Sequence, residues 1–184
     1  MRKRSLFAIT FAVTLTASLL ALYLNRPKPP AENVLTRVTD QVFITSQLSP
    51  DDIAQVTRAG MKSIIDIRPD GEATDQTPSS EIGTASRAQG LSFYYIPVPH
   101  EAIPDNAVNT LASALATTPR PALLYCRTGR RAVRLFALTE ASRTGGPAAE
   151  WIHQMVQAAG FSADDLRDEI ARRIDKRNAP TTPN

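Results

Sequence analysis

Ala-Leu-Leu-Tyr-Cys-Arg-Thr-Gly-Arg-Arg, residues 122–131, is the stretch that decides the fold. Its first four residues form a short apolar run, which predicts a buried strand. A helical pattern begins at Arg131 and continues to Ser142. Gly129 lies in the short loop between them and supplies the backbone freedom that a tight turn needs. The stretch therefore predicts a strand, a tight loop and a helix, in that order.

The apolar runs on both sides of this stretch alternate in the same way, and no internal repeat is visible. Short runs rich in β-branched and aromatic residues predict strands at 41–45, 61–67 and 91–98. Longer runs predict helices at about 50–59, 79–89, 104–116, 148–159 and 162–173. We therefore expect an α/β fold with a mostly parallel, four- to five-stranded sheet flanked by helices, which binds ligands at the carboxyl ends of its strands.

Composition narrows the classes of function. The 184 residues, of which 42% are hydrophobic and 21% charged, predict one folded domain. The basic excess comes from five residues near the N-terminus, so we expect no nucleic-acid partner: Arg2, Lys3, Arg4, Arg26 and Lys28. One cysteine and two histidines exclude an intramolecular disulfide and a cysteine-based zinc site, and we expect no metal and no cofactor.

The N-terminal segment is predicted to be a membrane anchor. Residues 6–24 carry no charge and are long enough to cross most of a bilayer as a helix, and basic residues precede them. We expect an uncleaved, single-pass transmembrane helix over 1–25, with a cleaved signal peptide as the alternative. The proline-rich residues 26–33 would form a linker, 34–176 the domain and 177–184 a disordered tail. The domain would then lie outside the cytoplasm, in the periplasm of a Gram-negative cell.

The loop that follows the predicted strand at 122–125 is predicted to bind an anion. Backbone N–H groups of such a loop can turn inward, and the following helix adds partial positive charge. Arginines surround Cys126 at positions 127, 130, 131 and 134. A helix N-terminus and nearby arginines favour the ionised form of a cysteine. We therefore expect Cys126 to be a thiolate and a nucleophile; packing in the core is the alternative reading.

Several stretches share their order and spacing with one known family: Tyr125–Arg131 (YCRTGRR), Phe43–Ser49 (FITSQLS), Ile67–Glu72 (IRPDGE), Tyr95–Pro99 (YIPVP) and Gly160–Phe161. Over about 38–166 the chain resembles the phosphatase-like domain of beta-lactamase hydrolase-like proteins, a branch of the protein tyrosine phosphatase-like fold. The loop alone is also similar to that of single-domain rhodaneses. The resemblance implies that Cys126 is the nucleophile and that Arg131 clamps the oxyanion. Residues Arg127, Thr128, Gly129 and Arg130 would form the cradle.

The length of this loop is also consistent with a second reaction, sulfur transfer. Four residues separate Cys126 from Arg131, whereas tyrosine phosphatases have five and rhodaneses commonly have four. Tyr125 also stands where these phosphatases commonly have histidine. A shorter ring offers fewer inward N–H groups and suits a sulfur atom on the cysteine better than a phosphoryl group.

Phosphate ester hydrolysis also needs a general acid on a neighbouring loop. Asp70 matches the family pattern and follows a predicted strand, although Pro-Asp-Gly is also an ordinary turn sequence. The other candidates are Glu72, His100, Glu101 and Asp105, the last of which reads more readily as a helix start. Arg68 could contact the anion or pair with Glu72.

Three functions are therefore expected from the sequence. The first is a cysteine-dependent phosphatase-like hydrolase acting through a cysteinyl-phosphate. The second is a sulfurtransferase that carries a persulfide on Cys126, and the third is an inactive anion-binding or interaction module. The corresponding partners are a small oxyanion or sulfur donor, or a phosphoprotein.

Overall fold

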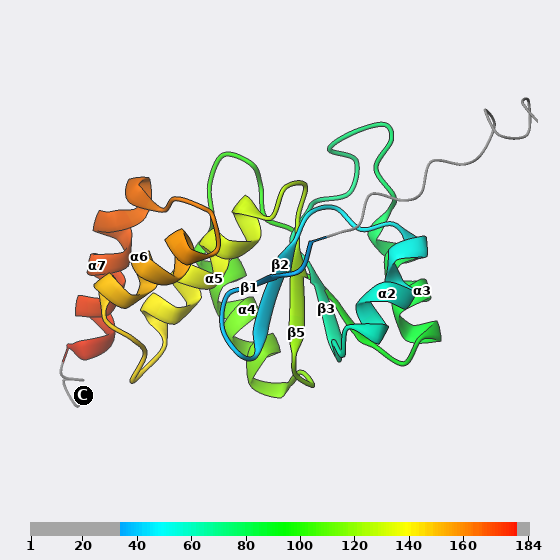
Figure 1. Cartoon of the computed structure of the whole chain (residues 1–184). Helices are drawn as coiled ribbons and strands as arrows, with labels where there is room; N and C mark the ends of the chain where they lie inside the picture. The colour runs from blue at the N-terminus through cyan, green and yellow to red at the C-terminus, as the bar shows by residue number, and fades with distance from the viewer. Residues whose placement is uncertain (1–33, 180–184) are drawn as a thin grey trace, which may run out of the picture. The chain divides into compact units, whose positions relative to one another are not determined.

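The computed structural model describes residues 34–179, which form one α/β unit built on a five-stranded sheet (Figure 1). The strands are β1 (Thr36–Arg37), β2 (Val42–Thr45), β3 (Ser63–Asp66), β4 (Ser92–Tyr95) and β5 (Ala122–Tyr125), in the spatial order β1-β2-β5-β3-β4. β2, β5, β3 and β4 run parallel, and β1 pairs antiparallel with β2 at the edge. The prediction of a mostly parallel sheet is confirmed.

The two central strands are buried on both faces, as expected for strands of a parallel sheet covered by helices. In register, Ile65 of β3 and Ile44 of β2 both pair with Leu124 of β5. The bounds of β5 agree with those predicted from its apolar run. Because β5 lies in the middle of the sheet, the loop that follows it leaves from the centre of one edge.

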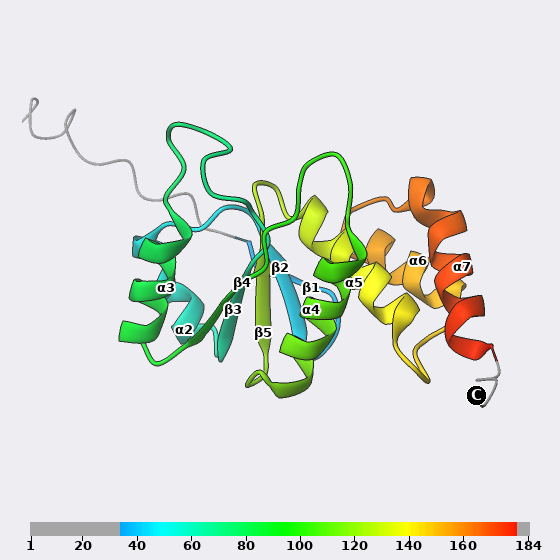
Figure 2. The same ribbon diagram turned by 180° about the vertical axis from the view of Figure 1, so that it is seen from behind.

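Helices cover both faces of the sheet (Figures 1 and 2). On one side lie η1 (Pro50–Asp52), α2 (Ile53–Arg58) and α3 (Ser79–Ala88). On the other lie α4 (Asp105–Thr117) and α5 (Arg130–Ser142). Beyond α5 the chain adds α6 (Ala149–Ala158), η2 (Asp164–Leu166) and α7 (Arg167–Asn178), and α5 packs against both of the added α-helices. Two apolar clusters fill the layers, one on each face of the sheet.

The structure differs from the sequence-based expectations at three places. β1 was not predicted, because two residues at an edge carry no periodic signal. The predicted helix at 162–173 is a short 3-10 turn followed by α7, which ends at Asn178. Residues 177 and 178, which the sequence assigned to the tail, therefore belong to α7. The reason is Arg177, whose guanidinium donates to the carbonyls of Glu140, Ala141, Gly146 and Pro147.

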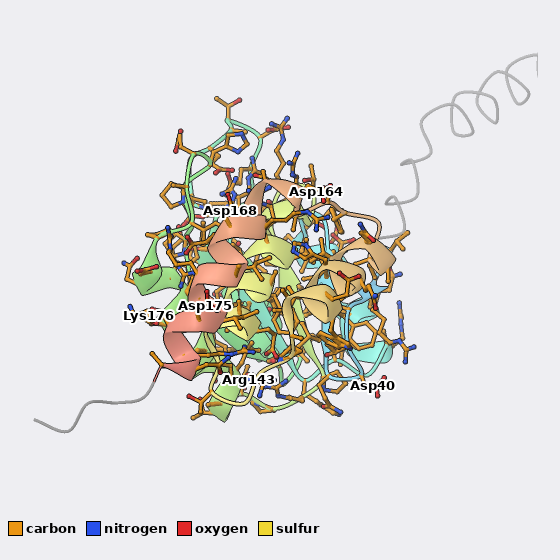
Figure 3. All side chains as sticks on the ribbon, turned by 90° about the vertical axis from the view of Figure 1, so that its left-hand side faces the viewer. Asp40, Arg143, Asp164, Asp168, Asp175 and Lys176 are labelled. Atoms are coloured by element: carbon orange, nitrogen blue, oxygen red, sulfur yellow. The ribbon has the colours of Figure 1, made fainter. Side chains whose placement is uncertain are left out.

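The predicted anchor and linker, residues 1–33, lie outside the described residues, as do residues 180–184 of the predicted tail. Among residues 34–179, no helix has both the length and the apolar character needed to cross a membrane. The outer face of α7 is strongly charged, with Asp168, Asp175 and Lys176 projecting from it (Figure 3).

Candidate active site

Cys126 lies directly after β5, at the floor of a pocket of about 1020 Å³. The residue is only 2% exposed and belongs to the apolar cluster on the α5 face, yet it lines the pocket. The loops after β3, β4 and β5 all rise at this edge of the sheet (Figures 1 and 2). A side chain in this position is shielded from bulk water and reachable by a ligand that enters the pocket.

The loop after Cys126 presents a row of free backbone donors. In residues 34–179, the main-chain N–H groups of residues 127–132 donate to no backbone carbonyl or side chain, and the ladder of α5 begins with Val133 N–H donating to Gly129 O at 3.0 Å. Such unsatisfied N–H groups at a helix N-terminus form a site for an anion. The loop is tied from outside, because Gln47 N–H donates to Arg127 O at 3.3 Å.

Gly129 is the residue that allows this loop conformation. Its φ of +84° lies in the left-handed region, which side-chain-bearing residues avoid. A Cβ there would lie 2.9 Å from Ile44 Cγ2, 3.1 Å from Phe161 Cζ and 3.3 Å from Thr45 O. Both the conformation and the close packing therefore require glycine.

Arg131 is held in a defined orientation at the wall of the pocket. Its Nη1 donates to Val98 O at 2.6 Å and lies 2.7 Å from Glu72 Oε1. Glu72 Oε2 lies 3.0 Å from Nε of Arg68, whose Nη1 donates to Gln47 Oε1 at 2.8 Å. Nε and Nη2 of Arg131 have no partner within the described part of the chain, so they are available to an anion.

Glu72 links the two arginines as an ionised carboxylate. Partial burial opposes its ionisation, but hydrogen bonds from Arg131 and Arg68 outweigh this and hold the pKa of Glu72 below its ordinary value. The sequence had named Glu72 as an acid candidate and Arg68 as its possible partner. Since a carboxyl group with a lowered pKa is a poor proton donor, the geometry gives Glu72 the role of orienting Arg131.

Asp70 lies in a different environment from the one expected for a general acid. Its two carboxylate oxygens accept hydrogen bonds from Ser79, at 2.7 Å from the backbone N–H and 2.6 Å from the hydroxyl. Asp70 thus caps the N-terminus of α3, and it does not line the pocket. Its catalytic role stays a prediction.

The other predicted residues are distributed as follows. Arg127, Thr128 and Arg130 line the pocket and are exposed. His100 and Glu101, on the loop after β4, also line the pocket. Asp105 is turned away and pairs with Arg173. His153 is buried on α6.

One feature of the pocket, and one buried carboxyl outside it, could not be found from the sequence. Asp165, Leu166 and Glu169 form one wall of the pocket, although they follow Cys126 by 39 or more positions in the chain. Asp66, at the end of β3, is 2% exposed, and burial raises its pKa to about 6, although the N–H of Arg68 favours its ionised form. The Tyr125 hydroxyl also lies near this carboxyl, without the geometry of a full hydrogen bond.

Comparisons with known proteins agree with this architecture. A protein from Xylella fastidiosa (strain Temecula1 / ATCC 700964), described as a beta-lactamase hydrolase-like protein, is 33% identical over 103 residues, which are 56% of this chain but only 24% of that protein. The crystal structure of a candidate phosphatase from Neisseria meningitidis Z2491 superposes with a TM-score of 0.67 at 28% identity, covering 76% of this chain and 97% of that one.

The fold is also that of protein tyrosine phosphatases. The structure of Tk-PTP in its active form superposes with a TM-score of 0.57 at 13% identity, covering 82% of this chain and 99% of that one. The family model of the beta-lactamase hydrolase-like protein, phosphatase-like domain, matches residues 34–143, which include β1 to α5 and the whole cysteine loop. The resemblance seen in the sequence is thereby confirmed, and the chain belongs to the family of phosphatase-like domains of beta-lactamase hydrolase-like proteins.

Proposed function

We propose that this protein hydrolyses phosphate monoesters with Cys126 as the nucleophile. The observation that carries the proposal is the position of this side chain, at the floor of an open pocket and followed by free N–H groups from 127 to 132. Membership of a phosphatase-like family supports the same reaction class. The unoccupied donors of Arg131 add a cation on the wall of the same pocket.

The reaction would proceed in two steps. The Cys126 thiolate attacks phosphorus and forms an S–P bond while the P–O bond to the leaving group breaks and that oxygen takes a proton from a general acid. Water then attacks the cysteinyl-phosphate, the conjugate base of the acid takes a proton from the water, and the thiolate leaves. Arg131 and the loop N–H groups would stabilise the negative charge on the phosphoryl oxygens in both transition states.

We assign the general acid to Glu101. It lines the pocket on the loop after β4, and it is exposed and makes no ion pair within residues 34–179. Asp70, the residue that the sequence favoured, has both carboxylate oxygens occupied by Ser79. The variants Glu101→Gln and Asp70→Asn separate the two assignments. We expect kcat to fall on the order of a hundredfold in the first and by less than about threefold in the second.

Hydrolysis of p-nitrophenyl phosphate by the wild type and three variants tests the proposal. Cys126→Ser should abolish turnover, and Arg131→Lys should lower kcat/KM on the order of a hundredfold, because lysine cannot donate in the same planar fork. Arg58→Lys is the matched control, since Arg58 lies at the end of α2, away from the pocket. Turnover that survives in Cys126→Ser would refute the proposal.

The four-residue spacing between Cys126 and Arg131 supports a second candidate, sulfur transfer through a persulfide on Cys126. That enzyme would transfer sulfur from thiosulfate to cyanide and would leave p-nitrophenyl phosphate intact. If the wild type catalyses neither reaction yet binds phosphate, the third function, an inactive anion-binding module, is favoured.

We further propose that residues 1–25 anchor the domain to a membrane with its active site outside the cytoplasm. The support is the uncharged run at 6–24 behind three basic residues. Protease added to intact spheroplasts should then degrade the domain, whereas a protected domain would place it in the cytoplasm.

A further inference from the structure

The C-terminal segment completes the pocket. The family model ends at residue 143, whereas Asp165 and Leu166 of η2 and Glu169 of α7 all line the pocket. Leu166 also packs against the apolar cluster on the α5 face. We name the segment from Asp164 to Glu169 the acidic wall. It contributes to the pocket although it lies outside residues 34–143, which the family model matches and which contain the cysteine loop.

The acidic wall neutralises one of the pocket arginines. Arg134 Nη1 lies 2.7 Å from Asp165 Oδ1, and its Nη2 lies 2.6 Å from Asp165 Oδ2. The hydrogen bonds from Arg134 lower the pKa of Asp165, so this carboxyl is ionised at neutral pH. A paired fork of this kind fixes both side chains in one orientation. Arg134 thus lines the pocket, but its guanidinium is already paired with the carboxylate of Asp165.

The basic residues behind the acidic wall are likewise occupied. Arg173 contacts Glu169, Asp105 and Ser142, and Arg172 contacts Glu169. Within residues 34–179, the pocket arginines that make no ion pair are Arg127 and Arg130, both on the cysteine loop. Free positive charge is therefore concentrated at the cradle and absent from the acidic wall.

Three apolar side chains from separate segments of the chain also line the pocket: Ile103, Leu138 and Leu166, the last of which belongs to the acidic wall. A substrate whose phosphate lies in the cradle would place its next atoms against these side chains. A second anionic group on such a substrate would lie near the carboxylates of the acidic wall and an arginine that is already paired. It would lose its hydration without gaining a cation as a partner.

We infer that the acidic wall selects substrates by charge: the pocket takes monophosphates with an uncharged, apolar remainder and rejects those that carry a second anionic group beyond the phosphate. The inference rests on the proposed function for the position of the phosphate, but the selection acts on binding and not on the chemical step. Asp165 is the specificity-determining residue, because it removes Arg134 from the set of free cations.

Two ligands of similar shape test the inference: phenyl phosphate and 4-carboxyphenyl phosphate, which adds one carboxylate. Their dissociation constants would be measured by calorimetry with the full chain carrying Cys126→Ser, so that no turnover interferes. We expect phenyl phosphate to bind about tenfold more tightly. Adding Asp165→Asn frees Arg134 and should reduce that ratio at least about fivefold.

Two further variants make the result specific. Asp168→Asn is the matched control, because Asp168 lies on the outer face of α7 and does not line the pocket, whereas its substitution changes the net charge equally (Figure 3). It should leave the ratio unchanged. Arg134→Gln breaks the same ion pair but leaves the Asp165 carboxylate unpaired and creates no free cation, so the ratio should not fall below the wild-type value.

Three results would each overturn the inference. The first is that Asp165→Asn leaves the ratio of the two dissociation constants unchanged, and the second is that Asp168→Asn changes this ratio as much as Asp165→Asn does. The third is that both ligands bind equally tightly to the protein that carries Cys126→Ser alone. Failure to bind either ligand would overturn it as well. Hydrolysis of phenyl phosphate by the wild type is measured separately. Selective binding without hydrolysis would refute the proposed function and leave the charge selection standing.

Discussion

The substitution Gly129→Ala tests whether the cysteine loop depends on one glycine for both its conformation and its packing. Gly129 has φ +84°, and an added Cβ would lie 2.9 Å from a side-chain carbon of Ile44 and 3.1 Å from Phe161. The left-handed conformation costs alanine about 1–2 kcal/mol. Forcing a methyl group into close-packed surroundings adds about 1–3 kcal/mol. The expected loss of unfolding free energy is therefore about 2–5 kcal/mol.

Gly60 provides the matched control for this prediction. It has a similar φ of +88°, but nothing lies within 4 Å of a Cβ placed on it. Gly60→Ala should therefore lose only the conformational part, about 1–2 kcal/mol. The difference between the two variants measures the packing contribution at the cysteine loop.

The assay is urea unfolding of the two variants and the wild type, followed by calorimetry with inorganic phosphate. We expect Gly129→Ala to be the less stable variant and to lose phosphate binding, because relief of the contacts displaces the N–H groups of the cradle. Gly60→Ala should bind phosphate like the wild type. Equal losses of stability in both variants, or unchanged phosphate binding in Gly129→Ala, would refute the reasoning.

Three other predictions follow from single contacts. Arg177→Ala should lower the unfolding free energy by about 2–4 kcal/mol, because four carbonyls lose their donor. Lys176→Ala, on the exposed face of α7, should change it by less than about 0.5 kcal/mol. Equal effects of the two substitutions in urea unfolding would contradict this. Burial raises the pKa of Asp66 to about 6, above its value in the unfolded chain. The neutral carboxyl therefore contributes to the free energy of unfolding in full below about pH 4, and this contribution is lost as the pH rises through 6. The stability of the wild type relative to Asp66→Asn should therefore fall by about 3 kcal/mol between pH 4 and 7, and a constant difference would count against the burial argument. Asp70→Asn should lower stability by about 1 kcal/mol through the cap of α3, and a large loss of kcat at unchanged stability would instead restore Asp70 as the general acid in place of Glu101.

Much of the fold was determined locally and could be read from the sequence. The run Ala122–Tyr125 is apolar throughout, which in a four-residue segment followed by a helical pattern specifies a central strand. The loop that follows gave the candidate nucleophile, because the residues that create an anion site here are neighbours in the chain. Prediction succeeded for these features since backbone direction and short-range spacing decide them.

The arrangement of charges around the pocket was decided only by tertiary structure. Arg134 and Asp165 are 31 residues apart and Arg131 and Glu72 further still, so no spacing rule indicates that they pair. Asp70 shows the opposite case: its sequence context suggested an acid at the site, but the start of α3 satisfies both its oxygens. A charged side chain takes the nearest partner in space, and that partner is fixed by how the helices pack. The sequence by itself thus determined the four parallel strands, the cysteine loop and the family, whereas the packing of α3, η2 and α7 determined which carboxylates and arginines remain free to act.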